Sequence, residues 1–408
     1  MSLARNLMRR IDALGKISEE SHCLTRRFCS PAMKAVNELV ASWMCEAGMS
    51  VRQDAIGNLI GHYPADQPGA KIFLLGSHLD TVRDAGKFDG PLGVLVAIAC
   101  VQMLHEKKLR FPFAIEVVGF SDEEGVRYQT AYLGSKGFAG DFDLNDLKRL
   151  DADAISMSDA IRDFGGNPTQ CTKLRLKPEL LLGYAEVHIE QGPVLEKKNL
   201  SVGIVSAIAG QTRAKIQFIG CAGHAGTTPM NLRKDALCAA AEFILAVEDH
   251  AKKISGLVAT VGQTETKPGA SNVIPASVTL SLDLRHQEDT QRIQAEKFFK
   301  RTAHDIARRR KIQLDWELVQ QSGAVPCSPK LSQLLTSAAR LHQRRVLNLP
   351  SGAGHDAAVI SKITPVAMLF VRCKNGVSHH PDESVKVDDV RVAISVLNDF
   401  LQLLARQK

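Results

Sequence analysis

A strand–helix–strand rhythm in the first third of the sequence most constrains the fold of this chain. Residues 72–75 form a short apolar run, residues 92–107 have the apolar face of a helix, and residues 114–120 are apolar and rich in β-branched side chains. This alternation is typical of a mostly parallel sheet covered by helices. Ligands of such sheets gather at the carboxyl ends of the strands. The residues that follow each run are therefore the first candidates for a functional site.

The rhythm changes near residue 214 and returns after residue 326. Strands and helices alternate as strand, helix, strand, strand, helix, strand over residues 214–219, 233–250, 257–263, 277–285, 289–310 and 312–319. This is the split βαβ order of a ferredoxin-like sandwich. The chain then continues as helix, strand and helix over residues 329–344, 366–371 and 388–406. We expect an α/β protein with a mixed, mostly parallel sheet in residues 1–211 and 325–408, and an inserted α+β domain in residues 212–324.

Composition excludes several classes of partner. Of 408 residues 45% are hydrophobic and 23% charged, which is ordinary for a soluble globular protein. The net charge of +7 is modest and no basic stripe is interleaved with aromatic residues, so we expect no nucleic-acid partner. No apolar run approaches the roughly 18 residues of a membrane span, and residues 1–16 lack a signal peptide. Nine cysteines without a CxxC pair indicate free thiols, and we expect a cytoplasmic protein.

Imidazoles and carboxylates recur just after the predicted strands. They are His78 with Asp80, Asp89, the pair Glu123 and Glu124, His188, and the neighbours His379 and His380. Each alone has a commoner structural explanation, such as a capping Asp, an Asx turn, a solvated acidic turn or a core histidine. Together they form a ligand set for divalent metals, with one carboxylate left over as a general base. This pattern predicts metal-assisted hydrolysis.

A family resemblance covers nearly the whole chain. The matching motifs are residues 54–58 (DAIGN), 76–82 (GSHLDTV), 121–125 (SDEEG), 188–193 (HIEQGP), 223–230 (GHAGTTPM), 271–275 (SNVIP) and 376–383 (GVSHHPDE). In this order they resemble the dinuclear metal amidohydrolases of the M20 peptidase superfamily, within its hydantoinase/carbamoylase branch. The resemblance implies a catalytic domain with an inserted dimerisation and lid domain, and therefore a homodimer.

The resemblance also implies a role for each candidate residue. The metal ligands would be His78, Asp89, Glu124, His188 and His379, with Asp89 bridging two divalent ions. Zn2+ or Mn2+ suits such a shell, and Co2+ is a further option. Glu123 would be the general base, and Asp80 would orient His78.

Residues of the inserted domain would bind the substrate. His224 would stabilise the oxyanion in the partner subunit's active site, although an exposed histidine with no role remains open. Gln211, Asn272 and Arg285 would hold ureido and carboxylate groups, although Arg285 beside Asp283 is also typical of a local ion pair. The turn of residues 351–356 would line the substrate through Gly354 and His355.

The expected reaction is hydrolysis of a ureido C–N bond in a small carboxylate. Residues 120–128 and 130–135 most resemble enzymes that act on allantoate, which would yield ureidoglycine or ureidoglycolate with ammonia and CO2. Because the site residues are shared, an N-carbamoyl-L-amino acid hydrolase or a β-ureidopropionase remains open. The further alternatives are a metallopeptidase of the same superfamily and a binding protein without catalysis.

Overall fold

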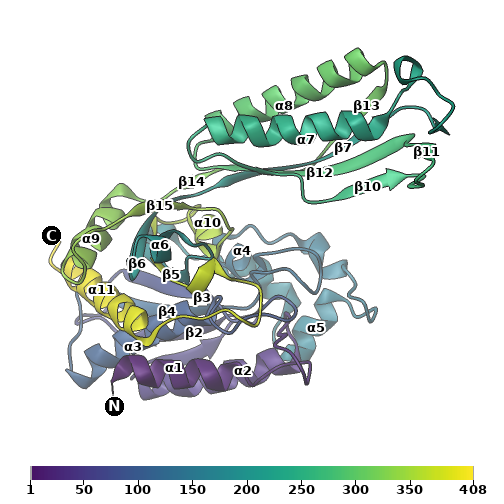
Figure 1. Cartoon of the computed structure of the whole chain (residues 1–408). Coiled ribbons are helices and arrows are strands. Elements are labelled where there is room, and N and C mark those ends of the chain that lie inside the picture. The colour runs from purple at the N-terminus through teal and green to yellow at the C-terminus, as the bar shows by residue number, and fades with distance from the viewer. Residues whose placement is uncertain (1, 408) are drawn as a thin grey trace. The chain divides into compact units, whose positions relative to one another are not determined.

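Two units make up the chain in the computed structural model, which describes residues 2–407 (Figure 1). The first unit takes in the chain up to Ser206, then Cys327–Leu349, and finally the chain from Ala353 onward. The second unit consists of Ala207–Pro326 and Pro350–Gly352. The first unit is therefore built from three separate stretches of sequence, and the second is inserted between them.

A mixed sheet in the order β1-β2-β4-β3-β5-β16-β6 forms the centre of the first unit. Its strands are β1 (Ser50–Gln53), β2 (Leu59–Tyr63), β3 (Ile72–His78), β4 (Ala114–Phe120), β5 (Leu181–Ile189), β6 (Val202–Ile208) and β16 (Val366–Val371). The four central strands β4, β3, β5 and β16 are mutually parallel, and β1, β2 and β6 run antiparallel to their neighbours. The short strands β14 (Val325–Pro326) and β15 (Asn348–Ser351) both pair with β6. The carboxyl ends of the four parallel strands therefore meet at one edge.

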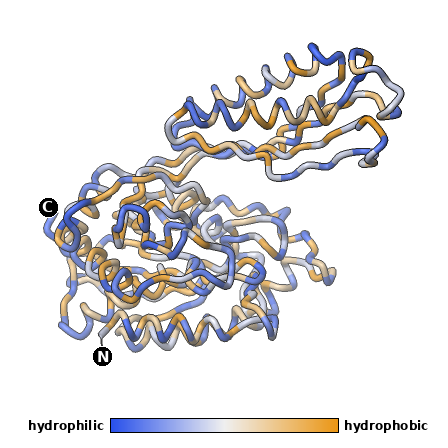
Figure 2. Tube along the Cα trace, viewed as in Figure 1, coloured by the Kyte–Doolittle hydropathy of each residue, from blue (hydrophilic) through white to orange (hydrophobic). Residues whose placement is uncertain are grey.

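The helices of the first unit pack on this sheet or on one another. They are α1 (Leu3–Leu14), α2 (Pro31–Glu46), α3 (Pro91–Glu106), α4 (Leu133–Ala139), α5 (Met157–Phe164), α6 (Val194–Lys197), α9 (Pro329–Arg340), α10 (Asp356–Ile360) and α11 (Val387–Ala405). Helix α3 is buried nearly all round and packs on β3, β4 and β5, as expected for a helix without a polar face. Hydrophilic and hydrophobic residues instead alternate around α1, whose buried positions Leu7, Ile11 and Leu14 lie on one face (Figure 2).

The start of α3 places its first turn directly against a predicted ligand. Asp89 immediately precedes Gly90, and Pro91 begins the helix, a position where the missing N–H of proline costs nothing. Gly90 has a φ of 81°, and a Cβ atom there would lie 2.5 Å from Cε1 of His78. Only glycine therefore fits between Asp89 and the helix while His78 keeps its place.

The second unit is a five-stranded antiparallel sheet covered by two helices. Its path is β10-β12-β7-β13, with β9 also pairing with β12. The elements are β7 (Gly210–Ile219), α7 (Ala236–Lys253), β9 (Val258–Thr260), β10 (Thr264–Lys267), β12 (Ser277–His286), α8 (Asp289–Arg310) and β13 (Gln313–Ser322). A separate two-stranded ladder joins β8 (Gly223–His224) to β11 (Val273–Ile274). The predicted α+β order of the insertion is present, and the predicted fold class is confirmed.

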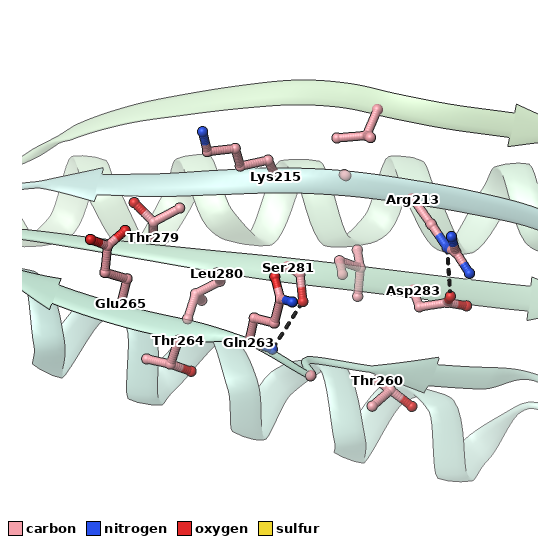
Figure 3. A pocket seen from close by; sticks show the side chains of 14 residues that line it. Arg213, Lys215, Thr260, Gln263, Thr264, Glu265, Thr279, Leu280, Ser281 and Asp283 are labelled. Atoms are coloured by element: carbon pink, nitrogen blue, oxygen red, sulfur yellow. Dashed lines mark hydrogen bonds and ion pairs between the residues drawn. The ribbon is translucent and has the colours of Figure 1, made fainter. Parts of the chain in front are cut away.

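One predicted strand of this unit is shorter than expected. The sequence predicts a strand over residues 257–263, whereas β9 ends at Thr260 and β10 begins at Thr264, beyond the predicted range. Between them, the N–H of Gln263 donates to the hydroxyl of Ser281 at 3.0 Å (Figure 3), and the carbonyl of Gln263 accepts the N–H of Ser281 at 3.1 Å. A side-chain oxygen therefore takes the place of one backbone acceptor between the two strands.

Burial alternates strictly along β12. Its buried residues are Val278, Leu280, Leu282, Leu284 and His286, and the four aliphatic ones belong to the core that the sheet forms with α7 and α8. The residues between them are only half-buried: Thr279, Ser281, Asp283 and Arg285. Figure 3 shows the strands with the helices behind them. One face of the sheet is therefore a hydrophobic core, and the other is polar.

Candidate metal centre

Three of the parallel strands bring most of the predicted ligands to one edge of the first unit's sheet. His78 is the last residue of β3, and it pairs in register with Phe120, the last residue of β4, which Glu123 and Glu124 follow. On the other side of β3, Gly76 pairs with Glu186, so His188 of β5 lies beside His78. The two imidazole rings have centroids 5.7 Å apart.

Two loops complete the cluster by placing Asp89 and His379 at this edge. The first group consists of His78, His188 and Asp89, all buried. Nε2 of His188 lies 3.0 Å from Oδ1 of Asp89, and Nε2 of His78 lies 3.6 Å from the same oxygen. A donor set of two imidazoles and a carboxylate fits a divalent cation such as Zn2+.

The second group uses the other oxygen of the same aspartate. Nε2 of His379 lies 3.2 Å from Oδ2 of Asp89 and 3.5 Å from Oε1 of Glu124. His380 does not join it, because its Nδ1 accepts the N–H of Asp382 and its side chain is exposed. Each oxygen of Asp89 therefore faces one group of candidate metal ligands, which is the arrangement of a carboxylate that bridges two ions.

The Nδ1 contacts of the two buried histidines leave both Nε2 atoms to face a cation site. Nδ1 of His188 lies 3.0 Å from the carbonyl oxygen of Ile189, and Nδ1 of His78 lies 3.1 Å from that of Asp80. A carbonyl only accepts hydrogen bonds, so each Nδ1 carries a proton and each Nε2 faces Oδ1 of Asp89. Burial lowers the pKa of both imidazoles, but the nearby carboxylates raise it above its ordinary value, so a proton on Nε2 satisfies Asp89 in the chain without ions. Once deprotonated, the two Nε2 atoms and Oδ1 are placed to bind one cation.

Asp80 does more than the sequence predicts. Its Oδ1 lies 3.4 Å from Nδ1 of His78, in keeping with an orienting role. The same carboxylate accepts the N–H of Glu123 at 3.0 Å and the N–H of Glu124 at 3.1 Å. It thereby fixes the backbone of two neighbouring glutamates, whose carboxylates both lie near His78, and Glu124 also belongs to the second group.

Burial sets the protonation of the two glutamates in the chain without ions. Burial, followed by the nearby charge of Glu124, raises the pKa of Glu123 well above its ordinary value. Burial also raises the pKa of Glu124 to about 7, although the nearby His78 lowers it. A buried carboxyl with a raised pKa is suited to holding a proton near neutral pH.

Unusual backbone conformations surround this cluster. His379, Gln191 and Tyr132 have φ values of 55°, 56° and 65°, in the left-handed region that non-glycine residues seldom adopt. Each such residue costs on the order of 1 kcal/mol and persists where the surroundings dictate it.

A layer of buried acids behind the ligands was not predicted. Glu186 accepts hydrogen bonds from the hydroxyls of Ser77 and Tyr184 and from the N–H of Ala357. Asp356 accepts a hydrogen bond from Ser135 at 2.5 Å, and its second oxygen has no partner among the described residues. The signal in the sequence was the alternation of Glu186 and His188 on one strand, which places both on the same face.

The predicted substrate turn lies partly inside this layer. His355 is buried, and its ring centroid is 4.5 Å from that of His188. Gly354 packs against the hydroxyl of Tyr132 so closely that no side chain fits there. The structure therefore places His355 against His188, a predicted ligand. Gly354 is exposed and has no side chain, so its backbone forms the surface at this point.

In the second unit, the predicted substrate residues form two pairs. His224 lies on β8 and Asn272 directly precedes β11, and the N–H of Ala225 donates to the carbonyl of Asn272 at 2.9 Å. Both side chains are exposed. Nδ1 of His224 accepts the N–H of Gly226 at 3.1 Å, so this ring presents Nε2 outward as its donor.

The other pair, Gln211 and Arg285, meets at Asp283 on the polar face of the sheet. Asp283 accepts hydrogen bonds from Nε and Nη2 of Arg285 at 2.7 and 2.9 Å and from the amide of Gln211 at 2.8 Å. Arg213 adds a third partner at 3.0 Å (Figure 3). Arg285 also donates to the carbonyl of Gly352 at 2.5 Å. The local ion pair that the sequence left open is therefore present, and it holds both predicted residues.

The described residues contain no helix with the length and apolar character of a membrane span.

Comparisons with known proteins agree on the kind of chain this is. Residues 74–403 match the model of peptidase family M20/M25/M40. An allantoate deiminase of Glycine max is 40% identical over 97% of this chain and 88% of its own length. An N-carbamoyl-L-amino acid amidohydrolase of Geobacillus stearothermophilus is also 40% identical, over the full length of both chains.

A solved structure of similar shape supports the same assignment. A hydantoinase/carbamoylase family amidase from Burkholderia multivorans superimposes with a TM-score of 0.93 at 29% identity, over 99% of this chain and 98% of that one. The resemblance inferred from the motifs is confirmed. The chain belongs to the M20/M25/M40 peptidase family.

Proposed function

We propose that this protein hydrolyses the ureido C–N bond of a small carboxylate, and that allantoate is its substrate. The observation that carries the proposal is the shared Asp89, with one donor group at each oxygen and Glu123 beside the second group. The names of the relatives support the reaction class, since both the deiminase and the carbamoyl amidohydrolase act on ureido groups.

The proposed cofactor is a pair of divalent ions per chain, with Zn2+ or Mn2+ as first candidates and Co2+ as a third. One ion would be held by His78, His188 and Asp89, and the other by Asp89, Glu124 and His379. Ions bound in this way act as Lewis acids and lower the pKa of a bound water toward neutrality.

Glu123 is the proposed general base. It is buried, and the N–H bond to Asp80 fixes its backbone, so the carboxylate is held in place before substrate arrives. In the proposed reaction it takes a proton from the attacking water and passes it to the departing ammonia. The carbamate that remains loses CO2, so allantoate and one water give ureidoglycine, ammonia and CO2.

The second unit would supply the groups that recognise the substrate. The guanidinium of Arg285 suits a carboxylate, and Gln211 and Asn272 suit a ureido group. His224, with Nε2 presented outward, would stabilise the oxyanion in the active site of a second copy, so the proposed working form is a homodimer. The nine free cysteines support the proposal of a cytoplasmic protein.

One assay tests the substrate. Purified protein loaded with Zn2+, Mn2+ or Co2+ is given allantoate, a series of N-carbamoyl-L-amino acids including N-carbamoyl-β-alanine, and a dipeptide, and ammonia or free amine is measured. We expect the highest kcat/KM with allantoate. No turnover of allantoate would end this proposal.

A second candidate is hydrolysis of N-carbamoyl-L-amino acids. It is favoured by the Geobacillus relative, which matches this chain over the full length of both at the same identity as the deiminase. Both reactions need a ureido carbonyl beside a carboxylate, so the same residues serve either substrate. A kcat/KM for an N-carbamoyl-L-amino acid above that for allantoate would select this alternative.

A further inference from the structure

A buried glutamate outside the predicted ligand set connects the two loops of the metal centre. Oε1 of Glu383 accepts the N–H of Phe88 at 2.7 Å and the N–H of Asp89 at 3.0 Å. Glu383 lies on the loop that carries His379, and its side chain is only 3% exposed. One carboxylate therefore ties the loop of the bridging aspartate to a segment almost 300 residues later in the chain.

The contact is close enough to need a glycine. A Cβ atom on Gly86 would lie 2.5 Å from Cδ and 2.6 Å from Oε1 of Glu383. Backbone and carboxylate therefore touch with no side chain between them, so the position of the loop follows the position of the glutamate.

The same loop pair also holds the side chain of Asp89. The hydroxyl of Ser378 lies 2.7 Å from Oδ2 of Asp89 and 3.3 Å from Oε2 of Glu383. The amide of Gln191 donates to the same Oδ2 at 2.9 Å and to the Ser378 hydroxyl at 3.1 Å. Backbone and carboxylate of Asp89 are thus both fixed from the segment that carries Glu383 and His379.

We propose that Glu383 is a positioning residue that holds Asp89 and His379 in register, so that the ion shared by Asp89, Glu124 and His379 binds only while Glu383 reaches the N–H groups of Phe88 and Asp89. This inference rests on the proposed pair of ions. It adds a residue that touches neither substrate nor ion and acts through hydrogen bonds to the backbone.

The two ion positions differ in how far they depend on this contact. His78 and His188 belong to strands β3 and β5, whose positions the sheet sets. His379 lies on a loop, is half exposed and has a φ of 55°. Loss of the Glu383 contact leaves the first group with two rigid ligands, but it frees both loops that meet in the second group. The second ion is therefore the one that should be lost.

Two conservative variants separate geometry from charge. Glu383→Gln removes the negative charge but keeps an oxygen at the same reach, which still accepts both N–H groups. Glu383→Asp keeps the charge but is one methylene shorter, so it does not reach the loop. If Glu383 acts by position, Gln retains the second ion and Asp loses it; if it acts by charge, the order is reversed.

Glu190 offers a matched control in the same unit. It is also a buried glutamate whose carboxylate accepts two backbone N–H groups, from Val194 at 2.7 Å and Leu195 at 2.9 Å. Those groups belong to α6, which carries no predicted ligand. Glu190→Asp therefore loses the same kind of contact at backbone groups that carry no predicted ligand.

The experiment measures ion binding to the full chain, not turnover. Each variant is stripped with a chelator and dialysed, and Zn2+ or Co2+ is titrated by calorimetry, with ions per chain counted by elemental analysis. We expect two ions for the unaltered protein, Glu383→Gln and Glu190→Asp. For Glu383→Asp we expect one tight ion, with the affinity for the second reduced by about 10- to 100-fold, as for other residues that orient ligands.

The outcomes are distinguishable. Fewer than two ions in the unaltered protein would contradict the proposed function itself. Two ions there together with full second-site affinity in Glu383→Asp would overturn the positioning role, and so would loss of the second ion in Glu383→Gln with retention in Glu383→Asp. An equal loss in Glu190→Asp would show that any buried carboxylate contact has this effect, and it would overturn the proposal as well.

Discussion

The candidate metal centre of the first unit and the polar sheet face of the second unit both gather charged side chains around one aspartate. The two aspartates differ in the kind of partner that surrounds them. Asp283 is surrounded by donors from its own unit, namely two arginines and a glutamine. Asp89 accepts hydrogen bonds from Ser378 and Gln191, but its two oxygens also face imidazole Nε2 atoms that can bind a cation, those of His78 and His188 at Oδ1 and that of His379 at Oδ2. The chain supplies all of these partners of Asp283 by itself, whereas the cluster around Asp89 also offers a set of candidate metal ligands.

This difference indicates which cluster does chemistry and which one holds a shape. A carboxylate that has hydrogen-bond donors at both oxygens holds its partners in place, as Asp283 does for Gln211 and Arg285. A buried carboxylate grouped with three imidazoles and a second carboxylate is a candidate ligand set for a divalent ion, which indicates function. The following changes test this contrast, from the largest expected effect to the smallest.

Asp89→Asn should abolish activity. The amide cannot bridge two cations as a carboxylate does, so we expect both ions to bind more weakly and ammonia release to fall below about one thousandth of the unaltered rate. Ion content and ammonia release measured on the same samples check this. Full ion content with unchanged turnover would show that the shared oxygen atoms of Asp89 do not define the centre.

Glu123→Gln should separate ion binding from catalysis. The amide keeps the shape but cannot accept a proton, so we expect kcat to fall by about 100- to 10,000-fold, the usual contribution of a general base. Ion stoichiometry should stay at two per chain. A variant that keeps its turnover would refute the assignment of Glu123 as the base.

Asp283→Asn should affect substrate binding and leave the metal centre intact. The neutral side chain holds Arg285 less firmly, so we expect KM for the carboxylate substrate to rise with little change in kcat. The expected rise is about tenfold, which corresponds to the free energy of one hydrogen bond to a charged group. A substrate analogue whose carboxylate is amidated serves as the control and should show no change. A change in ion content would mean that the two clusters are not independent.

The pH dependence of unfolding should differ between the protein without ions and the protein with Zn2+ bound at the candidate metal centre. The folded chain without ions has a raised pKa for Glu124, about 7, and for His379, about 9, so it binds more protons than the unfolded chain. Stability then falls as pH rises from about 4.5 to 9. Bound ions need deprotonated ligands and favour the opposite trend. We expect the gain in melting temperature on adding Zn2+ to grow with pH; a gain that shrinks with pH would contradict this sign.

Much of the fold follows from local pattern. The runs that end at His78 and Phe120 are short, apolar and bounded by turns, so their strands and the buried helix between them are visible in the sequence. The strand predicted over residues 257–263 ends at Thr260, and beyond it the N–H of Gln263 goes to the side chain of Ser281 on another strand. No local pattern contains that contact.

Only part of the candidate site is visible in the local sequence. Predicted ligands at strand ends, such as His188, could be named from the residues next to them in the chain. His379 needed the family resemblance to be preferred over His380. Residues that act through the backbone of a distant loop could not be named. Glu383 was visible in the motif of residues 376–383, but its partners Phe88 and Asp89 lie far away in the sequence.

The contact between Gly90 and the ring of His78 makes one position diagnostic. A methyl group at residue 90 would occupy the space of the imidazole, so any chain with a larger residue there has moved or abandoned its first histidine. A single letter, read before any assay, can therefore sort distant homologues of this fold into those able to keep the proposed pair of ions and those in which His78 must lie elsewhere.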